Sequence, residues 1–531
     1  MKTKIIRDPL HGYIEVDQHV LNIIRTDIFA RLHDILAPGP AYMVYPSLRV
    51  SRFTHSLGVY HLSRLYLRSL LQNTPSNIKE LLLEREGIRE SNVPEYLEKV
   101  VSFAGLLHDI GHGPFSHTSE LFLENVIGKN TDEKLIQEGI DRDILEHAKI
   151  HEKIGWLIIL RKLSNELQGI EPRDVVSVLC GHAIKGSQLT ELQAQILHRI
   201  ISSNIDADRL DYIPRDGYFS GVPFGGLDVT RIIINASIAK LGNNYVIAFN
   251  PRALSAIEHF LIARYLLYEY LYFHHIVNLY ELLLEFTLFY LYAASEVDNK
   301  MFDPERDEFI SFTDDYVLTK LYDIRSHIKR GDSCIDIDIR GQHISIPIIV
   351  LEGLFDRQKL PVSVWKRFAD FIVDLDRTIM PFLLRKYGSQ YANKIWKIIK
   401  ELFTPEKKDA WRYGSQVYDI LSSLGRKEAY APIILNKYKA YNIYEKIYIV
   451  SPQGYSGIEY MVDEVTRYSI IVRGIEKEWY PGRLFFYYHS GKQDFNRDKA
   501  RRDIEKIKTL ILEVLRHLID ERISKDFSKG D

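Results

Sequence analysis

Cysteine is nearly absent from this chain of 531 residues. The two cysteines, Cys180 and Cys334, cannot build a disulfide framework, and neither has a second cysteine at the spacing of a cysteine-based zinc site. This composition is typical of a protein from a reducing compartment, so we expect a cytoplasmic protein.

The sequence also has no excess of one charge sign and no long uncharged hydrophobic run. Its formal net charge is −2, which gives no overall bias toward nucleic acid or an anionic membrane. The first residues, MKTKIIRDPLHGYIEV, lack the apolar core of a signal peptide. The most apolar stretch, residues 254–294, is interrupted by charged residues such as Glu258, Arg264 and Glu269. This favours a buried helix of a soluble protein over a membrane span.

No internal repeat or low-complexity segment divides the chain, and its length allows two to four domains. Helical periodicity dominates residues 1–300, which we interpret as one helical core. Alternating apolar residues, as in 333–354, predict strands in a mixed region at 301–425. Residues 426–531 are expected to be an α/β region that ends in an amphipathic helix. The predicted fold class is therefore mainly α, with a helical core and an α/β C-terminal extension.

The stretch that carries most chemistry is LLHDIGHGPFSHTSE at residues 106–120. A mostly apolar run at 99–107 predicts a buried helix that Gly111, Gly113 and Pro114 then break. Side chains suited to metal binding or proton transfer cluster here, namely His108, Asp109, His112, His117 and Glu120. An adjacent His and Asp at a helix end can bind one ion but cannot complete its shell, so further ligands must come from elsewhere. Standing alone, such a pair is more often a hydrogen-bonded core pair.

Other segments supply matching parts. His55 lies in the first turn of a helix that we expect to run through Leu70, with Ser51 or Thr54 as its cap. His151 begins a later helix, either near a site or simply exposed. The run SSNIDADRLDYIPRD at 202–216 is dense in aspartate, and a solvated face is the usual explanation, although its apolar residues indicate partial burial. Residues 254–289 predict one long aromatic helix.

The order His55, His108-Asp109, Asp208 on three separate predicted helices resembles the HD phosphohydrolase superfamily. More narrowly, it is similar to the deoxynucleoside triphosphate triphosphohydrolases related to the SAM-and-HD-domain protein. The resemblance covers roughly residues 1–290 and is carried by RFTHSLGV (52–59), LLHDIGHGPFSHTSE (106–120), HEKIG (151–155), DADRLDYIPRD (206–216) and YLYFHH (270–275).

The resemblance implies three sets of site residues. The implied metal ligands are His55, His108, Asp109 and Asp208. The implied catalytic, proton-handling residues are His112, His117, Glu120 and His151. The implied substrate-binding residues are Arg52, Arg209, Tyr212, Asp216, Arg264 and Tyr272. Two imidazoles and two carboxylates suit a divalent metal, which could be Mg, Mn, Fe, Co, Ni or Zn.

Members of this family split a dNTP into deoxynucleoside and triphosphate. The resemblance thus implies a metal-dependent dNTP triphosphohydrolase that assembles as a homo-oligomer, a dimer or tetramer, with a nucleotide activator in some relatives. Nucleotide-pool control and phage defence are both compatible roles. Ala37 stands where relatives commonly have a Gln that reads the sugar, which leaves the choice between deoxy and ribo substrates open.

Two other functions remain open at this point. One is an HD phosphodiesterase or phosphatase that acts on a signalling nucleotide or a nucleic-acid end. The other is a non-catalytic protein that binds nucleotides or nucleic acid. In the second case the aromatic-basic segment NKYKAYNIYEK (436–446) would stack on a single strand, although a solvated helix or strand edge is the commoner explanation.

Overall fold

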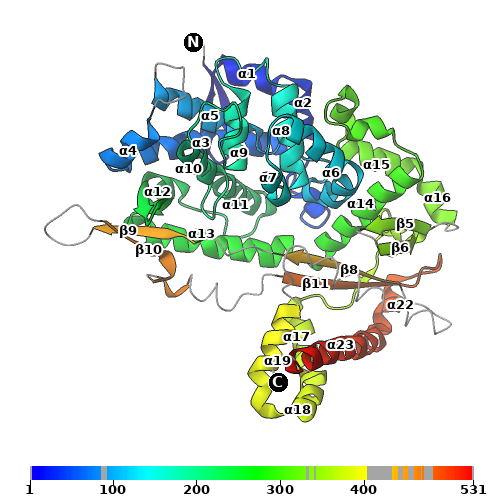
Figure 1. The fold of residues 1–531 in the computed structure, drawn as a ribbon. Helices are drawn as coiled ribbons and strands as arrows, with labels where there is room; N and C mark the ends of the chain where they lie inside the picture. Colours follow the sequence, from blue (N-terminus) through cyan, green and yellow to red (C-terminus); the bar gives the residue numbers. More distant parts are fainter. Residues whose placement is uncertain are drawn as a thin grey trace. The chain divides into compact units, whose positions relative to one another are not determined.

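The computed structural model describes residues 3–84, 92–330, 334–339, 342–402, 433–440, 446–452, 460–467, 469–471 and 482–528. It is mainly helical, which confirms the predicted fold class (Figure 1). The chain forms two compact units, one of Met1–Glu269, Val297–Leu318 and Tyr444–Lys477, the other of Tyr270–Glu296, Thr319–Ile443 and Glu478–Asp531. These units are not consecutive along the chain, unlike the three regions inferred from the sequence, and the predicted boundary near residue 425 lies outside the described residues.

The first unit contains an N-terminal hairpin, a helical core and a small sheet. Its strands are β1 (Lys4–Asp8), β2 (Gly12–Val16), β3 (Ala236–Leu241), β4 (Asn244–Phe249), β9 (Tyr448–Pro452) and β10 (Tyr460–Glu464). Its α-helices are α1 (Gln18–Ile24), α2 (Asp27–Ala30), α3 (Arg52–Asn73), α4 (Ser76–Leu82), α5 (Val93–Leu107), α6 (Glu120–Gln137), α7 (Arg142–His147), α8 (Ile150–Arg161), α9 (Pro172–Cys180), α10 (Glu191–Ile201), α11 (Ala207–Ser220), α12 (Val229–Ile234) and α13 (Leu254–Leu267). Short 3-10 turns are η1 (Arg31–Asp34), η2 (Gly39–Met43), η3 (Ser116–Ser119), η4 (Pro251–Ala253), η6 (Asn299–Phe302), η7 (Asp307–Ser311) and η10 (Val465–Arg467).

Helix α3 is the element against which the core of this unit packs. The Ser51 side chain caps it by accepting a hydrogen bond from the Thr54 backbone N–H. Of the two predicted caps, Ser51 and Thr54, Ser51 is therefore the one used. It packs against α5 and α11. A Cβ on Gly58 would overlap the Asp211 carboxylate of α11, and a Cβ on Gly105 of α5 would crowd Ser63. Glycine at both positions therefore lets three helices approach closely.

The small sheet joins distant parts of the chain in the strand order β10-β9-β4-β3. Strands β3 and β4 form an antiparallel hairpin, and β9 pairs in parallel with β4, placing Tyr448 opposite Ala248. A parallel neighbour cannot come from a tight turn. The chain therefore returns to this unit after a long excursion.

The second unit has its own helices and two small sheets. Its helices are α14 (His275–Ala293), the later part of α15 (Asp314–Asp323), α16 (Arg325–Arg330), α17 (Phe368–Thr378), α18 (Met380–Tyr387), α19 (Ala392–Leu402), α22 (Arg497–Arg502) and α23 (Ile504–Phe527), with η8 (Ile348–Leu354) and η9 (Ser389–Tyr391). Its strands are β5 (Cys334–Ile339), β6 (Gln342–Pro347), β7 (Val362–Ser363), β8 (Ile433–Ala440) and β11 (Gly482–His489). The predicted terminal amphipathic helix is confirmed by α23, which buries Ile507, Ile511 and Leu515 in a core shared with α17, α18 and α19.

The aromatic stretch 254–289 is not one helix, contrary to the prediction. Helix α13 ends at Leu267, a π-helical turn follows at Tyr268–Tyr272, and α14 begins at His275. His274 takes an extended backbone, and its ring accepts a hydrogen bond from the Ile276 N–H, which starts the new helix. Apolar periodicity continues through this break, so periodicity alone could not reveal it.

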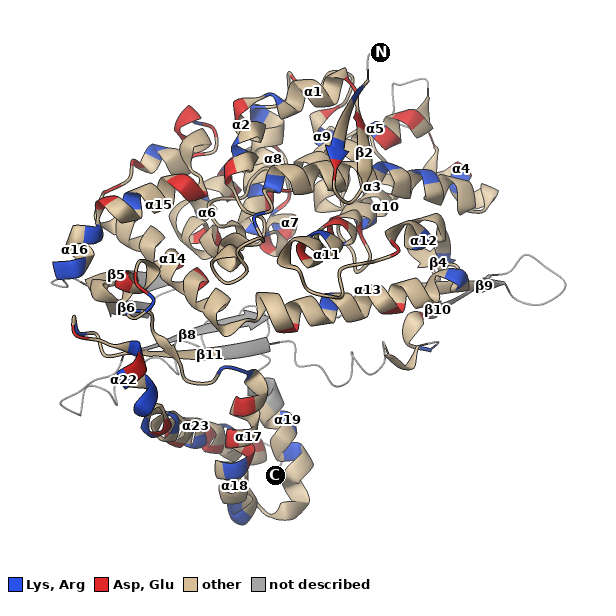
Figure 2. Cartoon of the chain, turned by 180° about the vertical axis from the view of Figure 1, so that it is seen from behind, with Lys and Arg blue, Asp and Glu red and all other residues tan. Residues whose placement is uncertain are grey.

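Helix α14 is long and apolar enough to cross a membrane, but 72% of its most apolar window is buried inside the structure, as in a core helix. Acidic and basic residues are spread over the helices of both units (Figure 2), in agreement with the formal net charge of −2. In the aromatic-basic segment, residues up to 440 belong to strand β8, and residues 441–445 lie outside the described part of the chain.

A buried carboxylate makes the helical core testable. Asp174 of α9 is fully buried and accepts hydrogen bonds of 2.6 Å each from the Tyr96 hydroxyl, the Ser187 hydroxyl and the Gln188 N–H. D174A leaves all three donors without their acceptor, so we expect the free energy of unfolding to fall by about 3 kcal/mol. The exposed Asp143 provides the control D143A, for which the expected loss is below about 1 kcal/mol. Equal losses in urea denaturation would show that the Asp174 hydrogen bonds do not stabilise the core.

Candidate metal centre and proton-transfer site

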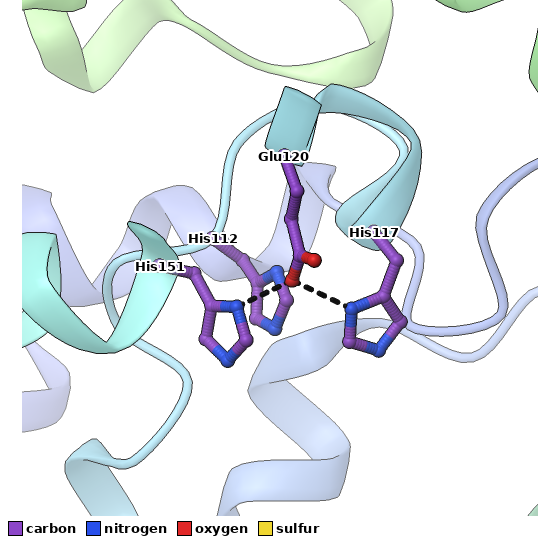
Figure 3. Close-up of side chains that lie close together, drawn as sticks. All are labelled: His112, His117, Glu120 and His151. Atoms are coloured by element: carbon purple, nitrogen blue, oxygen red, sulfur yellow. Dashed lines mark hydrogen bonds and ion pairs between the residues drawn. The ribbon is translucent and has the colours of Figure 1, made fainter. Parts of the chain in front are cut away.

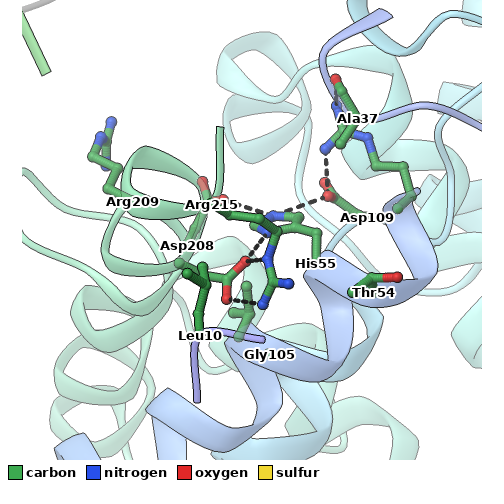
Figure 4. A network of polar contacts seen from close by, with 12 residues as sticks. Leu10, Ala37, Thr54, His55, Gly105, Asp109, Asp208, Arg209 and Arg215 are labelled. Atoms are coloured by element: carbon green, nitrogen blue, oxygen red, sulfur yellow. Dashed lines mark hydrogen bonds and ion pairs between the residues drawn. The ribbon is translucent and has the colours of Figure 1, made fainter. Parts of the chain in front are cut away.

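Three helices of the first unit bring the four predicted metal ligands together, and Figure 4 labels three of them, His55, Asp109 and Asp208. His55 lies in the first turn of α3, His108 and Asp109 follow the end of α5, and Asp208 lies in the first turn of α11. His55 Nε2 is 3.0 Å from Asp208 Oδ1 and 3.5 Å from Asp109 Oδ2. His108 Nε2 is 3.2 Å from Asp109 Oδ2 and 3.8 Å from Asp208 Oδ1. Donor atoms of His55, His108 and Asp109 thus lie within 4.8 Å of one another, and Asp208 Oδ1 lies beside both imidazoles.

Hydrogen bonds at the other ring nitrogens fix how both imidazoles are turned. His55 Nδ1 lies 2.7 Å from Asp211 Oδ2, and His108 Nδ1 lies 2.7 Å from the Gly105 carbonyl oxygen. Each Nδ1 therefore carries the proton it donates, and each Nε2 is the ring atom that faces the carboxylates and would bind a metal after losing its proton. His108 Nε2 is buried without an aligned hydrogen bond to any described residue. A divalent metal ion that accepts nitrogen and oxygen ligands fits this donor set.

The charges around these groups favour binding of a cation. Burial opposes ionisation of His55, but hydrogen bonds and the negative charges of Asp208 and Asp211 raise the pKa of His55 to about 10. Burial likewise opposes ionisation of Asp109, yet the charges of Arg52 and His108 hold the pKa of Asp109 well below its usual range. The site thus keeps a carboxylate ionised and stabilises positive charge at His55 Nε2, the atom to which a metal would bind.

Asp211 supports His55 from behind. This carboxylate is fully buried and also lies 2.6 Å from His11 Nε2 and accepts two hydrogen bonds from Arg215, at 2.8 and 2.7 Å. Arg215 in turn donates to Asp8 Oδ2 at 2.9 Å, which links the β1–β2 hairpin to the metal ligands. The sequence analysis saw Asp211 only as part of an acidic run and did not single out His11. The available signal was the spacing of Asp208 and Asp211, three residues apart on one helix face.

The predicted proton-handling residues form a second cluster (Figure 3). Glu120 Oε1 lies 2.8 Å from His117 Nδ1 and 2.5 Å from His151 Nδ1, so one carboxylate oxygen orients two imidazoles. The ring of His112 stacks on that of His151 with centroids 3.8 Å apart. His112 Nε2 is 3.3 Å from Asp109 Oδ1, so the two clusters adjoin.

The protonation states of this cluster suit acid–base chemistry. Burial, together with the charges of Arg52 and His151, holds the pKa of His112 well below its usual range, so its ring is neutral. Burial would raise the pKa of Glu120, but the charges of His117 and His151 hold it well below its usual range. The ligand atoms of the four residues lie within 4.8 Å of one another, a distance at which they could also hold an ion. Because Glu120 already bonds two ring nitrogens, carboxylate-oriented histidines describe the cluster better.

Close packing of backbone sets the distance between the two halves of this cluster. A Cβ on Gly111 would overlap the backbone of α8 at His151 and Gly155, so the turn that carries His112 lies directly on the helix that carries His151. Only glycine permits this approach. The two histidines can therefore stack although they lie 39 positions apart in the sequence.

The predicted substrate-binding residues are placed in several ways. Arg52 pairs with Asp109 and donates to Ser116 Oγ at 3.0 Å and to the Ala37 carbonyl at 3.4 Å, so it supports a proposed metal ligand. Arg209 pairs with Asp206, and Arg264 donates to Asn204 Oδ1 at 3.1 Å. Contact of these cations with a phosphate stays a prediction.

The two tyrosines and Asp216 differ in setting. Burial raises the pKa of the Tyr212 hydroxyl well above its usual range, and the charges that act on it include Arg264 and Arg209, so these groups are neighbours. Asp216 is buried one turn later on α11. Tyr272 belongs to the second unit, and its predicted contact with substrate stays a prediction. The sequence analysis did not select Lys149. This exposed residue lies close enough to Glu120 and Arg209 for their charges to act on its pKa.

A cavity of about 930 Å³ in the same unit shares His11 with the Asp211 network. It is lined by His11, His61 and Tyr218 among others, and none of the proposed metal ligands lines it. Ligand pockets of this size are common in proteins. The candidate site is therefore defined by the chemistry of its side chains and not by this cavity.

Comparisons with known proteins agree with this geometry. Residues 52–213 match the HD domain family. The chain is 30% identical over 285 residues to the uncharacterized protein YwfO of Bacillus subtilis, which covers 53% of this chain and 54% of that protein. It is 29% identical over 224 residues to the deoxynucleoside triphosphate triphosphohydrolase SAMHD1 homolog of Dictyostelium discoideum, covering 41% of this chain and 37% of that protein. A hypothetical protein from Aquifex aeolicus has a similar fold, with a TM-score of 0.53 and 21% identity over 96% of this chain and 99% of that chain.

The two curated relatives share about half of their length or less with this chain. The HD match begins at Arg52, just before His55, and extends past Asp208, so it includes all four candidate metal ligands. An HD domain indicates a metal-dependent phosphohydrolase. The chain therefore contains an HD domain at residues 52–213 and resembles the HD-domain phosphohydrolases of the SAMHD1 type.

Proposed function

We propose that this protein is a metal-dependent triphosphohydrolase that cleaves a dNTP into deoxynucleoside and triphosphate. The observation that carries the proposal is the contact between the candidate metal ligands and the proton-transfer cluster. Asp109 faces the candidate metal ligands with Oδ2 and His112 with Oδ1, at 3.3 Å from His112 Nε2. A metal-binding set and a proton-transfer set that share one carboxylate can act on the same phosphorus atom.

The chain supplies the acid–base part of this reaction. A divalent ion held by His55, His108, Asp109 and Asp208 would supply an activated water and neutralise charge that develops on phosphorus. Glu120 holds His117 and His151 through Nδ1, which leaves each Nε2 available to hand a proton to the leaving 5′ oxygen. The Asp211 hydrogen bond keeps the His55 ring from turning while substrate binds.

The cations of α11 and α13 suit a polyphosphate. A triphosphate carries about four negative charges, and charge-assisted bonds to several cations are expected at its site. Arg209 and Arg264 lie near Tyr212, and Lys149 lies near Arg209. Arg209 is paired with Asp206, so phosphate binding at Arg209 has to compete with that ion pair.

Ala37 bears on which sugar is accepted. Its carbonyl accepts a hydrogen bond from Arg52, and its methyl side chain cannot hydrogen-bond a sugar hydroxyl. A ribonucleotide therefore remains a candidate substrate beside the dNTP. From the resemblance alone we further propose a cytoplasmic homo-oligomer with a nucleotide activator.

The first test measures products with dNTPs and NTPs, singly and mixed, with Mg²⁺ or Mn²⁺. Nucleoside plus triphosphate is the expected outcome, and H108Q and D109N should each lower kcat by about 1000-fold or more because each removes a proposed metal ligand. H182Q changes an exposed histidine and should leave kcat unchanged. Release of monophosphate or pyrophosphate would favour the phosphodiesterase or phosphatase function, and an active H108Q/D109N variant would exclude a catalytic HD pair.

A second prediction concerns metal affinity. D211N keeps the shape of Asp211 but weakens its hold on His55 Nδ1, so we expect the Kd for Mn²⁺ to rise about 10- to 100-fold. Isothermal titration calorimetry on the two proteins measures this directly, without an activity assay. D143N, at an exposed position, is the matched control. An unchanged Kd in D211N would mean that the Asp211 hydrogen bond does not support metal binding.

A third prediction concerns pH in chelator-treated protein. The pKa of His55 is raised from 6.5 to about 10 in the folded state, so proton binding there stabilises the fold. The stabilisation is fully present below about pH 6.5, the unfolded pKa, and is lost as pH rises toward about 10. We therefore expect the Tm difference between wild type and H55Q to shrink steadily from pH 6.5 to pH 10. A difference that stays constant over this range would contradict the protonated, carboxylate-paired state of His55.

A further inference from the structure

The turn that carries His112 and His117 has a backbone that needs support. Phe115 and Ser116 both have positive φ values, 54° and 56°. Residues with a Cβ rarely take this left-handed conformation, and two in succession are rarer still. Such conformations persist only where surrounding contacts hold them, and they concentrate at functional sites.

Asp314 bonds this turn through its main chain. Its carboxylate, 4% exposed, accepts a hydrogen bond from the Phe115 N–H at 2.6 Å and another from the Leu36 N–H at 3.1 Å. Ser116 Oγ donates to the Leu36 carbonyl at 2.6 Å, so the turn and residue 36 are joined twice. The carboxylate bonds the N–H of the first left-handed residue.

Arg31 holds the other side of the turn. Its guanidinium, in a side chain that is 3% exposed, donates from Nη2 to the carbonyls of Ile110 at 3.0 Å and His112 at 2.8 Å. Nη1 donates to the Phe312 carbonyl at 3.1 Å, and the group stacks over the Phe309 ring at 4.3 Å. The buried Arg31 guanidinium thus binds carbonyls of Ile110 and His112, at the turn, and of Phe312, in the segment before α15.

Arg31 and Asp314 are linked through residues 309–314. Phe312 also packs against Gly113, where an added Cβ would lie 3.3 Å from its ring. Burial lowers the pKa of Arg31 to about 9, and the nearby negative charge of Asp314 opposes that shift. Residues 309–314 therefore contact the turn directly at the Phe115 N–H and at Gly113, and they reach its carbonyls only through Arg31.

We propose that Arg31 and Asp314 are positioning residues that hold the turn from Gly111 to His117 in its left-handed form and so place His112 and His117 in the proton-transfer cluster. Neither is proposed to touch substrate. Both lie outside residues 52–213, so the matched HD domain does not contain all that shapes its own site. The inference deepens the proposed function, but its structural part can be tested without any enzymatic activity.

The test uses chemical modification of histidine by diethyl pyrocarbonate on the full chain, read by mass spectrometry. The reagent attacks neutral imidazole, and the side chain of His112 is 1% exposed whereas that of His117 is 60% exposed. In R31K and D314N we expect the modification rate of His112 to rise about tenfold because the turn opens locally. R25K and D315N change exposed neighbours of the same type and should leave the rate unchanged.

His198 provides an internal reference for opening of the whole unit. It lies on α10, and its ring lies 2.9 Å from the Val178 carbonyl of α9, so neither it nor this partner belongs to the turn. A faster rate at His112 with an unchanged rate at His198 supports positioning of the turn. Unchanged His112 overturns the proposal. Equal acceleration of both histidines also overturns it, because the two residues would then stabilise the unit as a whole.

Kinetics supply an independent readout if the wild type hydrolyses a nucleotide. R31K and D314N should lower kcat about 10- to 100-fold while KM and the Kd for Mn²⁺ change less than about twofold. A parallel loss of Mn²⁺ affinity would overturn the assignment to the proton-transfer turn. If the wild type shows no hydrolysis, the proposed function fails, and the modification experiment still decides the role of Arg31 and Asp314.

Discussion

The carboxylate of Asp211 is the interaction on which the candidate site depends most. It is fully buried, and it contacts His55, His11 and Arg215 at hydrogen-bonding distances. A buried charge is costly unless it is paired and hydrogen-bonded, so these contacts form a set in which each member requires the others. Gly58 makes the room, because any side chain there would overlap the carboxylate. The orientation of His55, the closeness of α3 and α11 and the attachment of the N-terminal hairpin all follow from this group.

The gathering of the metal ligands could be predicted because their local signals are strong. His108 and Asp109 follow a helix whose apolar run and glycine stop are visible in the sequence, and the structure ends α5 at Leu107. Ser51 was one of two predicted caps, and it places His55 in the first turn of α3. The resemblance to a known family then connected these segments, which spacing alone could not do.

The supporting residues could not be predicted because their roles depend on distant partners. Nothing near Arg31 in the sequence shows that its side chain will collect carbonyls of Ile110, His112 and Phe312. Asp314 looks like an ordinary first-turn residue of α15 until its contact with Phe115 is seen. The break between α13 and α14 was missed for a related reason, since apolar residues continue through it and only the backbone departs from the helix.

The parallel pairing of β9 with β4 has a consequence for how the protein is made. The strand at 448–452 completes a sheet begun at residues 236–249, almost two hundred positions earlier. During synthesis the HD domain leaves the ribosome long before β9 and β10 exist; two segments of the second unit emerge in between, and its last segment, Glu478–Asp531, follows. Until β9 has been synthesised, the edge of strand β4 has no partner strand from β9. An unpaired edge of this kind favours association with other strands. Such nested connectivity ties the completion of one unit to the emergence of the other, although each packs around its own core.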